Sequence, residues 1–278
     1  MSHARLFALG LALMLGRAVV AVELSPTPTL LYDSFPTGGQ GMNGVRCQSR
    51  DLVTNMYIDL TGSATVYNTP GAPFGVPSVF LIGPRLVMCH PSAILQGMSR
   101  RDAVYRVRLD GCGFASVRIE ATTGRNPQFT PTVTWYVYVG ETNWASPLFT
   151  SSQLNTPIDL TIPFFDGMEV FFATNAGVND FNDNAGFMEP RVTGMSATPC
   201  RPDLTTSATA GSRCYGVPNG VITNEDFFYY LTQFAAGNAA VADLTNTALP
   251  GSPGYGVPNG IVSNDDFFFY LTLFAARC

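Results

Sequence analysis

The chain has 278 residues and a formal net charge of −5 at pH 7; 13% of its residues are charged and 46% are hydrophobic. All 15 basic residues are arginine, and the absence of lysine excludes Schiff-base chemistry on a lysine and a P-loop lysine. An acidic balance without basic clusters argues against binding to nucleic acid or to anionic membrane surfaces. The length suggests about two domains.

Residues 1–22 have the pattern of a secretory signal peptide. His3 and Arg5 supply a weakly positive start, Leu6 to Leu15 form an apolar core, and cleavage is expected after Ala21. This core is too short to cross a bilayer of about 30 Å, and no other stretch is long enough. We therefore expect an exported protein, secreted or at the cell surface, with no transmembrane segment in the mature chain.

The cysteines agree with export, because disulfides form in oxidising compartments. Their spacing matches no zinc site, and sequence alone does not choose among the pairings. Cys200 and Cys278 bracket the C-terminal region, so we expect a disulfide between them. That bond would leave Cys214 unpaired, or joined to a cysteine outside its own domain. The pairing of the others stays open: Cys47, Cys89 and Cys112.

Residues 23–197 form the larger predicted domain, and their periodicity is that of β-strands. Turn signals such as Asp110-Gly111 and Asp166-Gly167 separate the strands, and no helix of ten or more residues is indicated. Roughly eight short strands are typical of an antiparallel β-sandwich or jelly roll. The clearest strands are expected at 79–81, 103–109, 115–120, 132–139, 158–162 and 168–173.

The second half of this domain resembles a galactose-binding-like carbohydrate-binding module, over about residues 100–192. Phe187 and Glu189 stand where that family has a tryptophan and an aspartate. The resemblance implies a non-catalytic accessory module that binds polysaccharide during its breakdown. The matching residues of the closing motif are Thr174, Ala176, Gly177, Asp183, Ala185, Pro190 and Arg191.

Two loops of this domain carry candidate ligand-binding residues. Trp144 follows a turn, so its ring could stack on a sugar or could plug the end of the sandwich. The loop 179–189 carries side-chain oxygens that could hydrogen-bond sugar hydroxyls or hold calcium, although such residues are also ordinary in turns. The candidates in this loop are Asp180, Asn182, Asp183 and Glu189.

Catalysis has little support in the sequence. His90 is the only histidine after the signal, and it adjoins Cys89, so the two side chains on one strand would point to opposite faces. A glycosidase needs two facing carboxylates, and no pair stands out. The sequence therefore predicts a protein that is not an enzyme.

Residues 198–278 contain one unit written twice, at 203–238 and 243–278. Tyr215-Gly216-Val217-Pro218-Asn219-Gly220 recurs as Tyr255-Gly256-Val257-Pro258-Asn259-Gly260, and 16 of the 24 positions from Tyr215 to Asn238 are identical in the second copy. Each copy ends in an apolar pattern of helical period, with Phe227, Tyr230, Leu231 and Phe234 in the first. Thr223 with Asp226, and Ser263 with Asp266, are expected to form capping boxes.

The paired units resemble a dockerin, of the variant with a Gly-Cys-like tail. That family has two tandem calcium loops, each followed by a helix, which implies an EF-hand-like pair holding one or two calcium ions. Here each loop would be interrupted by an insertion, within 206–218 and 246–258. The alternative is that the acids only cap the helices and that the loops are only turns. The implied calcium ligands are Asp203, Thr205, Asn219, Val221, Thr223 and Asp226 in the first copy, and Asp243, Thr245, Asn259, Ile261, Ser263 and Asp266 in the second.

The resemblance also implies a partner, which would be a cohesin-like protein or a surface assembly. In that family the residues at loop positions 10 and 11 recognise the partner; here these are Asn224 and Glu225, then Asn264 and Asp265. Phe269 and Leu273 lie off the apolar stripe of the second helix, so we expect them to extend this surface. The alternative is that they pack against the loop 246–258.

The combined prediction is an exported binding protein, a sandwich that binds glycan and a tail that attaches it elsewhere. Two other hypotheses remain open at this point. The chain could be a structural cell-surface protein without a small ligand, or a hydrolase whose site is not visible in the sequence.

Overall fold

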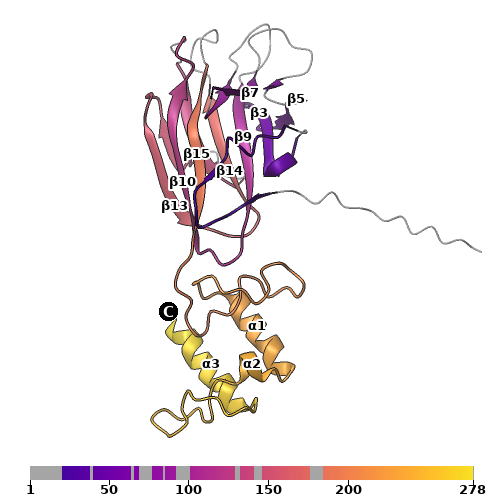
Figure 1. The fold of residues 1–278 in the computed structure, drawn as a ribbon, viewed down its shortest axis with the longest axis vertical. Coiled ribbons are helices and arrows are strands. Elements are labelled where there is room, and N and C mark those ends of the chain that lie inside the picture. The colour runs from indigo at the N-terminus through magenta and orange to yellow at the C-terminus, as the bar shows by residue number, and fades with distance from the viewer. Residues whose placement is uncertain are drawn as a thin grey trace, which may run out of the picture.

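The computed structural model describes residues 21–37, 40–63, 66–68, 77–83, 85–91, 101–128, 132–140, 146–175 and 184–277. They form a β-sandwich followed by a helical tail at one of its ends (Figure 1). No helix among these residues is long and apolar enough to cross a membrane. The expected signal peptide lies almost wholly outside the described residues, and β1 begins at Val22, directly after the expected cleavage point.

Two sheets make up the sandwich. Within these sheets, all but one of the strand pairs in the described residues are antiparallel. The first sheet has the order β12-β11-β14-β9-β3-β4, with β1 pairing with β9 in parallel. Its strands are β1 (Val22–Glu23), β3 (Val45–Asp51), β4 (Tyr57–Asp59), β9 (Arg101–Asp110), β11 (Thr134–Val139), β12 (Phe149–Ser151) and β14 (Met168–Asn175).

The second sheet has the order β13-β10-β15-β8-β7-β6-β5, with β2 pairing with β15. A short 3₁₀ helix, η1 (Met42–Gly44), precedes β3. The strands of the second sheet are β2 (Thr29–Leu30), β5 (Thr61–Ser63), β6 (Val66–Asn68), β7 (Ser78–Ile82), β8 (Leu86–His90), β10 (Ser116–Arg125), β13 (Pro157–Pro163) and β15 (Ala185–Met195).

The predicted sandwich is confirmed, and so are its six predicted strands, which correspond to β7, β9, β10, β11, β13 and β14. Alternation explains this success, because one face of each strand packs in the core between the sheets. The core is closed across the sheets: the indole of Trp135 in β11 donates to the carbonyl oxygen of Gly186 in β15 at 2.8 Å. A Cβ at Gly186 would meet the carbonyl oxygen of Val87 in the neighbouring strand β8 at 2.1 Å, so the close approach of these two strands requires glycine.

The tail contains α1 (Asn224–Ala235), a single turn α2 (Ala239–Ala242) and α3 (Asn264–Ala276). Both predicted capping boxes are present, with Thr223 and Ser263 at the N-caps. The helices share a core of aromatic side chains in which contacts between the two copies recur in equivalent pairs. Phe227 packs on Phe274 at 5.7 Å between ring centroids, and Phe234 packs on Phe267 at 5.8 Å. The two copies are therefore related by an approximate two-fold axis.

Candidate functional sites

The inserted loops of the tail are closed by buried aspartates that accept hydrogen bonds from backbone N–H groups. In the first copy the Asp203 carboxylate accepts from Asn219 at 3.1 Å and from Gly220 at 2.6 Å. Asp226 Oδ1 accepts from Leu204 and Thr205, at 2.7 and 2.9 Å. Asp203 thus joins the start of the first unit to the turn before α1, and Asp226 joins it to the N-terminus of α1.

The second copy repeats this network residue for residue. Asp243 accepts from the N–H groups of Asn259 and Gly260 at 3.0 and 2.5 Å. Asp266 Oδ1 accepts from Leu244 and Thr245, at 2.6 and 2.8 Å. Burial alone would raise the pKa of Asp266, but the N–H groups of Thr245, Leu244 and Ser263 together with the Ser263 hydroxyl outweigh it and lower the pKa.

Two of the residues that sequence placed as calcium ligands, Asp226 and Thr205, do not fit the ion as they lie here. A carboxylate offers about four lone-pair sites, and those of Asp226 are taken by Leu204 N, Thr205 N, Thr223 N and Thr223 Oγ1. The Thr205 hydroxyl donates to the Ser207 carbonyl at 2.6 Å and accepts from Gly216 N at 2.8 Å. Calcium binding stays a prediction, and it would require this network to be taken apart.

The expected partner surface needs one correction, because Phe269 is buried. Only 4% of Phe269 is exposed: its ring stands edge-on against Tyr255 at 4.9 Å and under the Arg201 guanidinium at 5.2 Å. Leu273 is half-buried against the same tail core. The inserted loop therefore covers this face, as the alternative had it. Its neighbour Phe268 is the residue that points outward, with 56% of its surface exposed.

The four residues at loop positions 10 and 11 are all exposed; position 10 is asparagine in both copies, and only position 11 differs. The carboxylate of Glu225 accepts a hydrogen bond from Ala208 N at 2.5 Å and so closes its own loop. The structure gives no such bond for Asp265. Asn224 and Asn264 are the first residues of α1 and α3. The open acidic end of the tail is therefore that of the second copy.

In the sandwich, the outer face of the first sheet carries aromatic and charged side chains. The rings of Tyr136 and Tyr138 in β11 lie 5.6 Å apart and nearly parallel. The Arg106 guanidinium lies 5.2 Å above the ring of Phe171, in the neighbouring pair of strands. We call this set the outer-face cluster: Arg50, Tyr57, Asp102, Arg106, Tyr136, Tyr138 and Phe171.

One end of the outer-face cluster is a buried ion pair. Arg50 Nη1 lies 3.4 Å from Asp102 Oδ2, and Arg50 Nη2 donates to Asn55 at 2.7 Å. Asp102 is only 2% exposed, and its Oδ1 has no hydrogen-bond partner in the structure; the same holds for Gln48 Oε1. Burial raises the pKa of Asp102 to about 7, although the Arg50 cation and a hydrogen bond with the Asn175 side chain lower it in part. A buried acid with a specific charge partner and a perturbed pKa is typical of functional sites.

Most of the ligand-binding residues expected from the sequence lie outside the described residues, namely Trp144, Asp180, Asn182 and Asp183. Their flanking strands show where the two loops begin. Val139 precedes one loop and pairs with Val170, whereas Asn175 precedes the other and pairs with Thr134. The loops thus leave from opposite ends of the β11–β14 pair. Glu189 is described, and both of its oxygens contact arginines: Arg85 at 2.6 Å and Arg191 at 2.6 Å.

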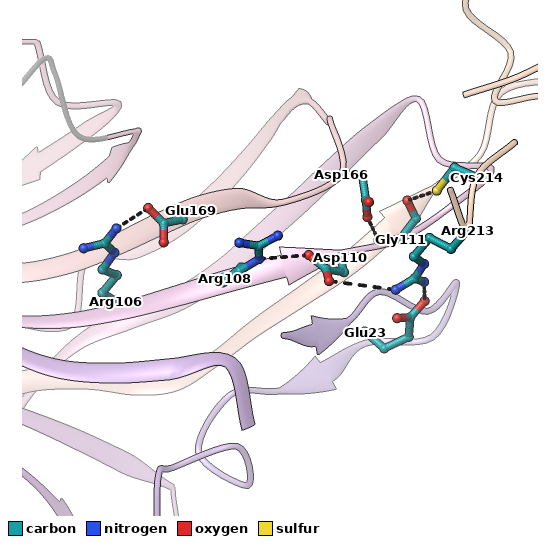
Figure 2. A network of polar contacts seen from close by, with 9 residues as sticks. All are labelled: Glu23, Arg106, Arg108, Asp110, Gly111, Asp166, Glu169, Arg213 and Cys214. Carbon is teal, nitrogen blue, oxygen red and sulfur yellow. Dashed lines mark hydrogen bonds and ion pairs between the residues drawn. The ribbon is translucent and has the colours of Figure 1, made fainter. Parts of the chain in front are cut away.

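A disulfide and a group of ion pairs join the tail to the sandwich, and Figure 2 shows the ion pairs of Arg213. Cys214 of the tail is bonded to Cys112 in the β9–β10 turn, so Cys214 is paired outside its own domain. Arg213 pairs with Glu23 and approaches Asp110 Oδ2 at 3.9 Å. Cys47 and Cys89 are free and buried. Cys278 lies outside the described residues, so the Cys200–Cys278 bond stays a prediction.

No group of three or more His, Cys, Asp or Glu side chains that could hold a metal ion occurs in the described parts of the chain. Cys89, beside the histidine that sequence analysis weighed, is buried in the core, and burial raises the pKa of its thiol above the ordinary range. A buried thiol of this kind is not an activated nucleophile.

Comparison with known proteins gives structural likeness only. No family model and no curated protein matches the chain. Solved structures similar to the sandwich include a CBM51 module of a Clostridium perfringens GH95 protein in complex with methyl-galactose, 11% identical over 60% of this chain and 100% of that one, with a TM-score of 0.30. A GlcNAc complex of CBM51-2 and INT domains from Clostridium perfringens ZmpB is 13% identical over 61% of this chain, with a TM-score of 0.30.

The chain spans 32% of the length of that ZmpB structure. Tandem CBM51 modules of a Streptococcus pneumoniae family 98 glycoside hydrolase are 15% identical over 57% of this chain and 51% of theirs, again with a TM-score of 0.30. Rabbit GITRL is also similar, 8% identical over 55% of this chain and 96% of its own, with a TM-score of 0.23. Likeness at these scores carries no argument about function.

Proposed function

We propose that this chain is an exported, non-catalytic binding protein, in which the sandwich binds a hydroxyl-rich ligand such as a glycan and the tail attaches it to a partner or a surface assembly. The disulfide between the two parts supports export, because such bonds persist in oxidising compartments. The absence of a catalytic constellation among the described side chains is compatible with this proposal but does not carry it.

The observation that carries glycan binding is the outer-face cluster. Tyr57 and Tyr136 are partly exposed there, beside the buried pair of Arg50 and Asp102. Small-ligand sites combine aromatic surface with a few polar groups of fixed position. An aromatic ring offers an apolar face to a sugar ring. Asp102 Oδ1 lies buried beside these rings, so a sugar hydroxyl would reach it only where ligand binding opens the cluster.

A glycan array with the full-length chain tests this proposal. Tyr136→Ala should weaken binding to any recognised glycan by at least about tenfold, the factor that corresponds to about 1.4 kcal/mol. Asp159→Ala is the matched control, because Asp159 forms an exposed ion pair with Arg118 on the second sheet. Equal binding by both variants would place the site elsewhere. Failure to bind any glycan would favour a structural surface protein.

For the tail, we propose that the second copy contacts the partner. Asn264 and Asp265 begin α3, and the exposed ring of Phe268 lies one turn further on. The dockerin resemblance supports the choice of positions, and the engagement of Glu225 within its own loop favours the second copy over the first. A cohesin-like domain is the partner that this resemblance implies.

Binding of a cohesin domain to the full chain, measured by calorimetry, tests this second proposal. Phe268→Ala and Asp265→Ala should each weaken binding. Phe228→Ala is the control, because Phe228 holds the same position in the first copy and is equally exposed, at 55%. A stronger effect of Phe228→Ala would assign the contact to the first copy. The absence of any binding would leave the attachment proposal without its implied partner.

A further inference from the structure

The loop Tyr-Gly-Val-Pro-Asn-Gly occurs twice in the tail with the same fold but in two different settings. In both copies a threonine hydroxyl organises it: Thr205 Oγ1 accepts from Gly216 N at 2.8 Å, and Thr245 Oγ1 accepts from Gly256 N at 2.7 Å. The bridge between Ser207 and Tyr215 likewise recurs between Thr247 and Tyr255. The loop fold is therefore a property of the repeat.

The residues just before this loop differ between the copies. The first copy has Arg213-Cys214, whereas the second has Pro253-Gly254. The second copy keeps the hydrogen bonds and the bridge without an arginine or a cysteine there. Arg213 and Cys214 are consequently not needed for the fold of the repeat. Their contacts indicate a different role, which is to join the repeat to the sandwich.

Those contacts all go to one end of the sandwich (Figure 2). The Cys214 Sγ is bonded to Cys112 and lies 3.5 Å from the carbonyl oxygen of Gly111, and the Gly111 N–H donates to Asp166 at 2.9 Å. Arg213 faces the carboxylates of Glu23 and Asp110. One cation of the tail thus meets a group of acids that β1 and two turns of the sandwich bring together.

The loop of the first copy packs against the sandwich, whereas the corresponding loop of the second copy is exposed to solvent. Val217 is partly buried near Gly113 of the sandwich, whereas Val257 is 57% exposed. Gly220 lies against Ala197 of the linker, whereas a Cβ added at Gly260 would meet nothing within 4 Å. In Figure 1 the first loop adjoins the sandwich and the second lies at the far end of the tail. The linker from Ser196 to Cys200 has no regular structure and is mostly exposed, so it does not hold the tail in place.

We propose that Arg213 and Cys214 form a thiol-sensitive latch that holds the first repeat against the sandwich. In the oxidised chain the disulfide keeps the two parts together, and the ion pairs orient them. Reduction opens the latch: two equivalents of a small thiol or one protein dithiol give two electrons and two protons to the Cys112–Cys214 bond, and leave as a disulfide. The tail then moves on its linker, and the loop 213–220 becomes as open as the loop 253–260.

The exposure of the two bonded cysteines and the weakness of the ion pairs are both consistent with this function. Cys214 is buried and Cys112 is partly exposed, so the side of Cys112 is the one from which we expect a thiolate to attack. The side chains of Arg213 and Glu23 are 43% and 60% exposed. Ion pairs exposed to this extent contribute little. Once the covalent bond is gone, they do not hold the tail.

The test uses the full-length chain in oxidising buffer and the variant Arg213→Pro/Cys214→Gly, which copies the second repeat. Proteinase K cleavage within the linker 196–200, mapped by mass spectrometry, reports on the linker, and small-angle scattering reports on the distance between the parts. We expect cleavage at least tenfold faster in the variant, a larger radius of gyration, and unchanged helical and tryptophan signals. Dithiothreitol should give the parent chain the same properties, and the variant leaves Cys200 and Cys278 untouched.

Cys112→Ser is the second variant, because it leaves the tail sequence intact in case the double variant does not fold. Cleavage and scattering that match the oxidised parent in a folded variant would show that non-covalent contacts hold the tail, and would overturn the latch. The parent chain, reduced and with the thiols of Cys112 and Cys214 alkylated, gives a further check. Cleavage and scattering like those of the oxidised parent would overturn the latch here as well.

Discussion

The rings of Tyr230 and Tyr270 stack at 3.8 Å between centroids, only 5° from parallel, at the centre of the tail. The hydroxyl of each ring reaches the start of the other copy: Tyr230 donates to Ala242 O and Tyr270 donates to Pro202 O, both at 3.4 Å. The core of each unit is thus completed by its partner unit. This arrangement explains why two copies occur together, because one alone would expose its apolar face.

Tyr230→Ala should unfold the tail and leave the sandwich intact. Removing a buried aromatic ring costs about 3–5 kcal/mol, which is a large fraction of the stability of a unit this small. Helical circular dichroism reports the tail, whereas fluorescence reports the sandwich, because both tryptophans precede residue 197. Tyr230→Phe is the control and should retain most of the stability. Loss of both signals together would mean that the two parts fold as one unit.

Phe269→Ala and Phe268→Ala should have opposite consequences, although the residues are neighbours. Phe269 is buried between Tyr255 and Arg201, so its removal should lower the stability of the tail by about 3 kcal/mol or more. Phe268 is exposed, and its replacement should change stability by about 0.5 kcal/mol or less. Thermal melts of the two variants, followed by circular dichroism, compare them directly. Equal melting temperatures would contradict the burial of Phe269.

A chelator should leave the melting curve of the tail unchanged. The loops are closed by hydrogen bonds from Asp203, Asp226, Asp243 and Asp266, so their order does not depend on an added ion. Differential scanning calorimetry with EDTA and with excess calcium makes this comparison. A rise in melting temperature with calcium, removed by Asp226→Ala and Asp266→Ala, would instead support the calcium loops that the dockerin resemblance implies.

Asp102 should make the sandwich less stable as the pH rises through neutrality. Its folded pKa of about 7 lies above the ordinary value of 3.8, so its contribution is fully present below the ordinary pKa and is lost as pH rises through about 7. Urea unfolding followed by tryptophan fluorescence, at about pH 5 and about pH 8, measures this loss. Asp102→Asn should flatten the dependence. Asp159→Asn should not, because the Arg118 hydrogen bond lowers the pKa of Asp159, below this range.

Local patterns determined much of this protein. Alternation located the six clearest strands, because the pleat sends neighbouring side chains to opposite faces. Thr223 with Asp226 and Ser263 with Asp266 located both helix starts, because a capping box is made within four residues. The hexapeptide Tyr-Gly-Val-Pro-Asn-Gly, which occurs twice, also revealed two copies of one unit. The two copies form equivalent hydrogen bonds in the structure.

Contacts between distant segments were decided only by the tertiary structure. Helical spacing places Phe268 and Phe269 about 100° apart, but it does not say that the loop around Tyr255 covers the second ring and leaves the first in solvent. Cys112 and Cys214 are 102 residues apart, and no local pattern pairs them. Arg50 and Asp102 meet only because β3 and β9 are neighbours in register, so strand pairing, which is non-local, created this part of the outer-face cluster. At the junction, the parallel pairing of β1 with β9 places Glu23 beside Asp110.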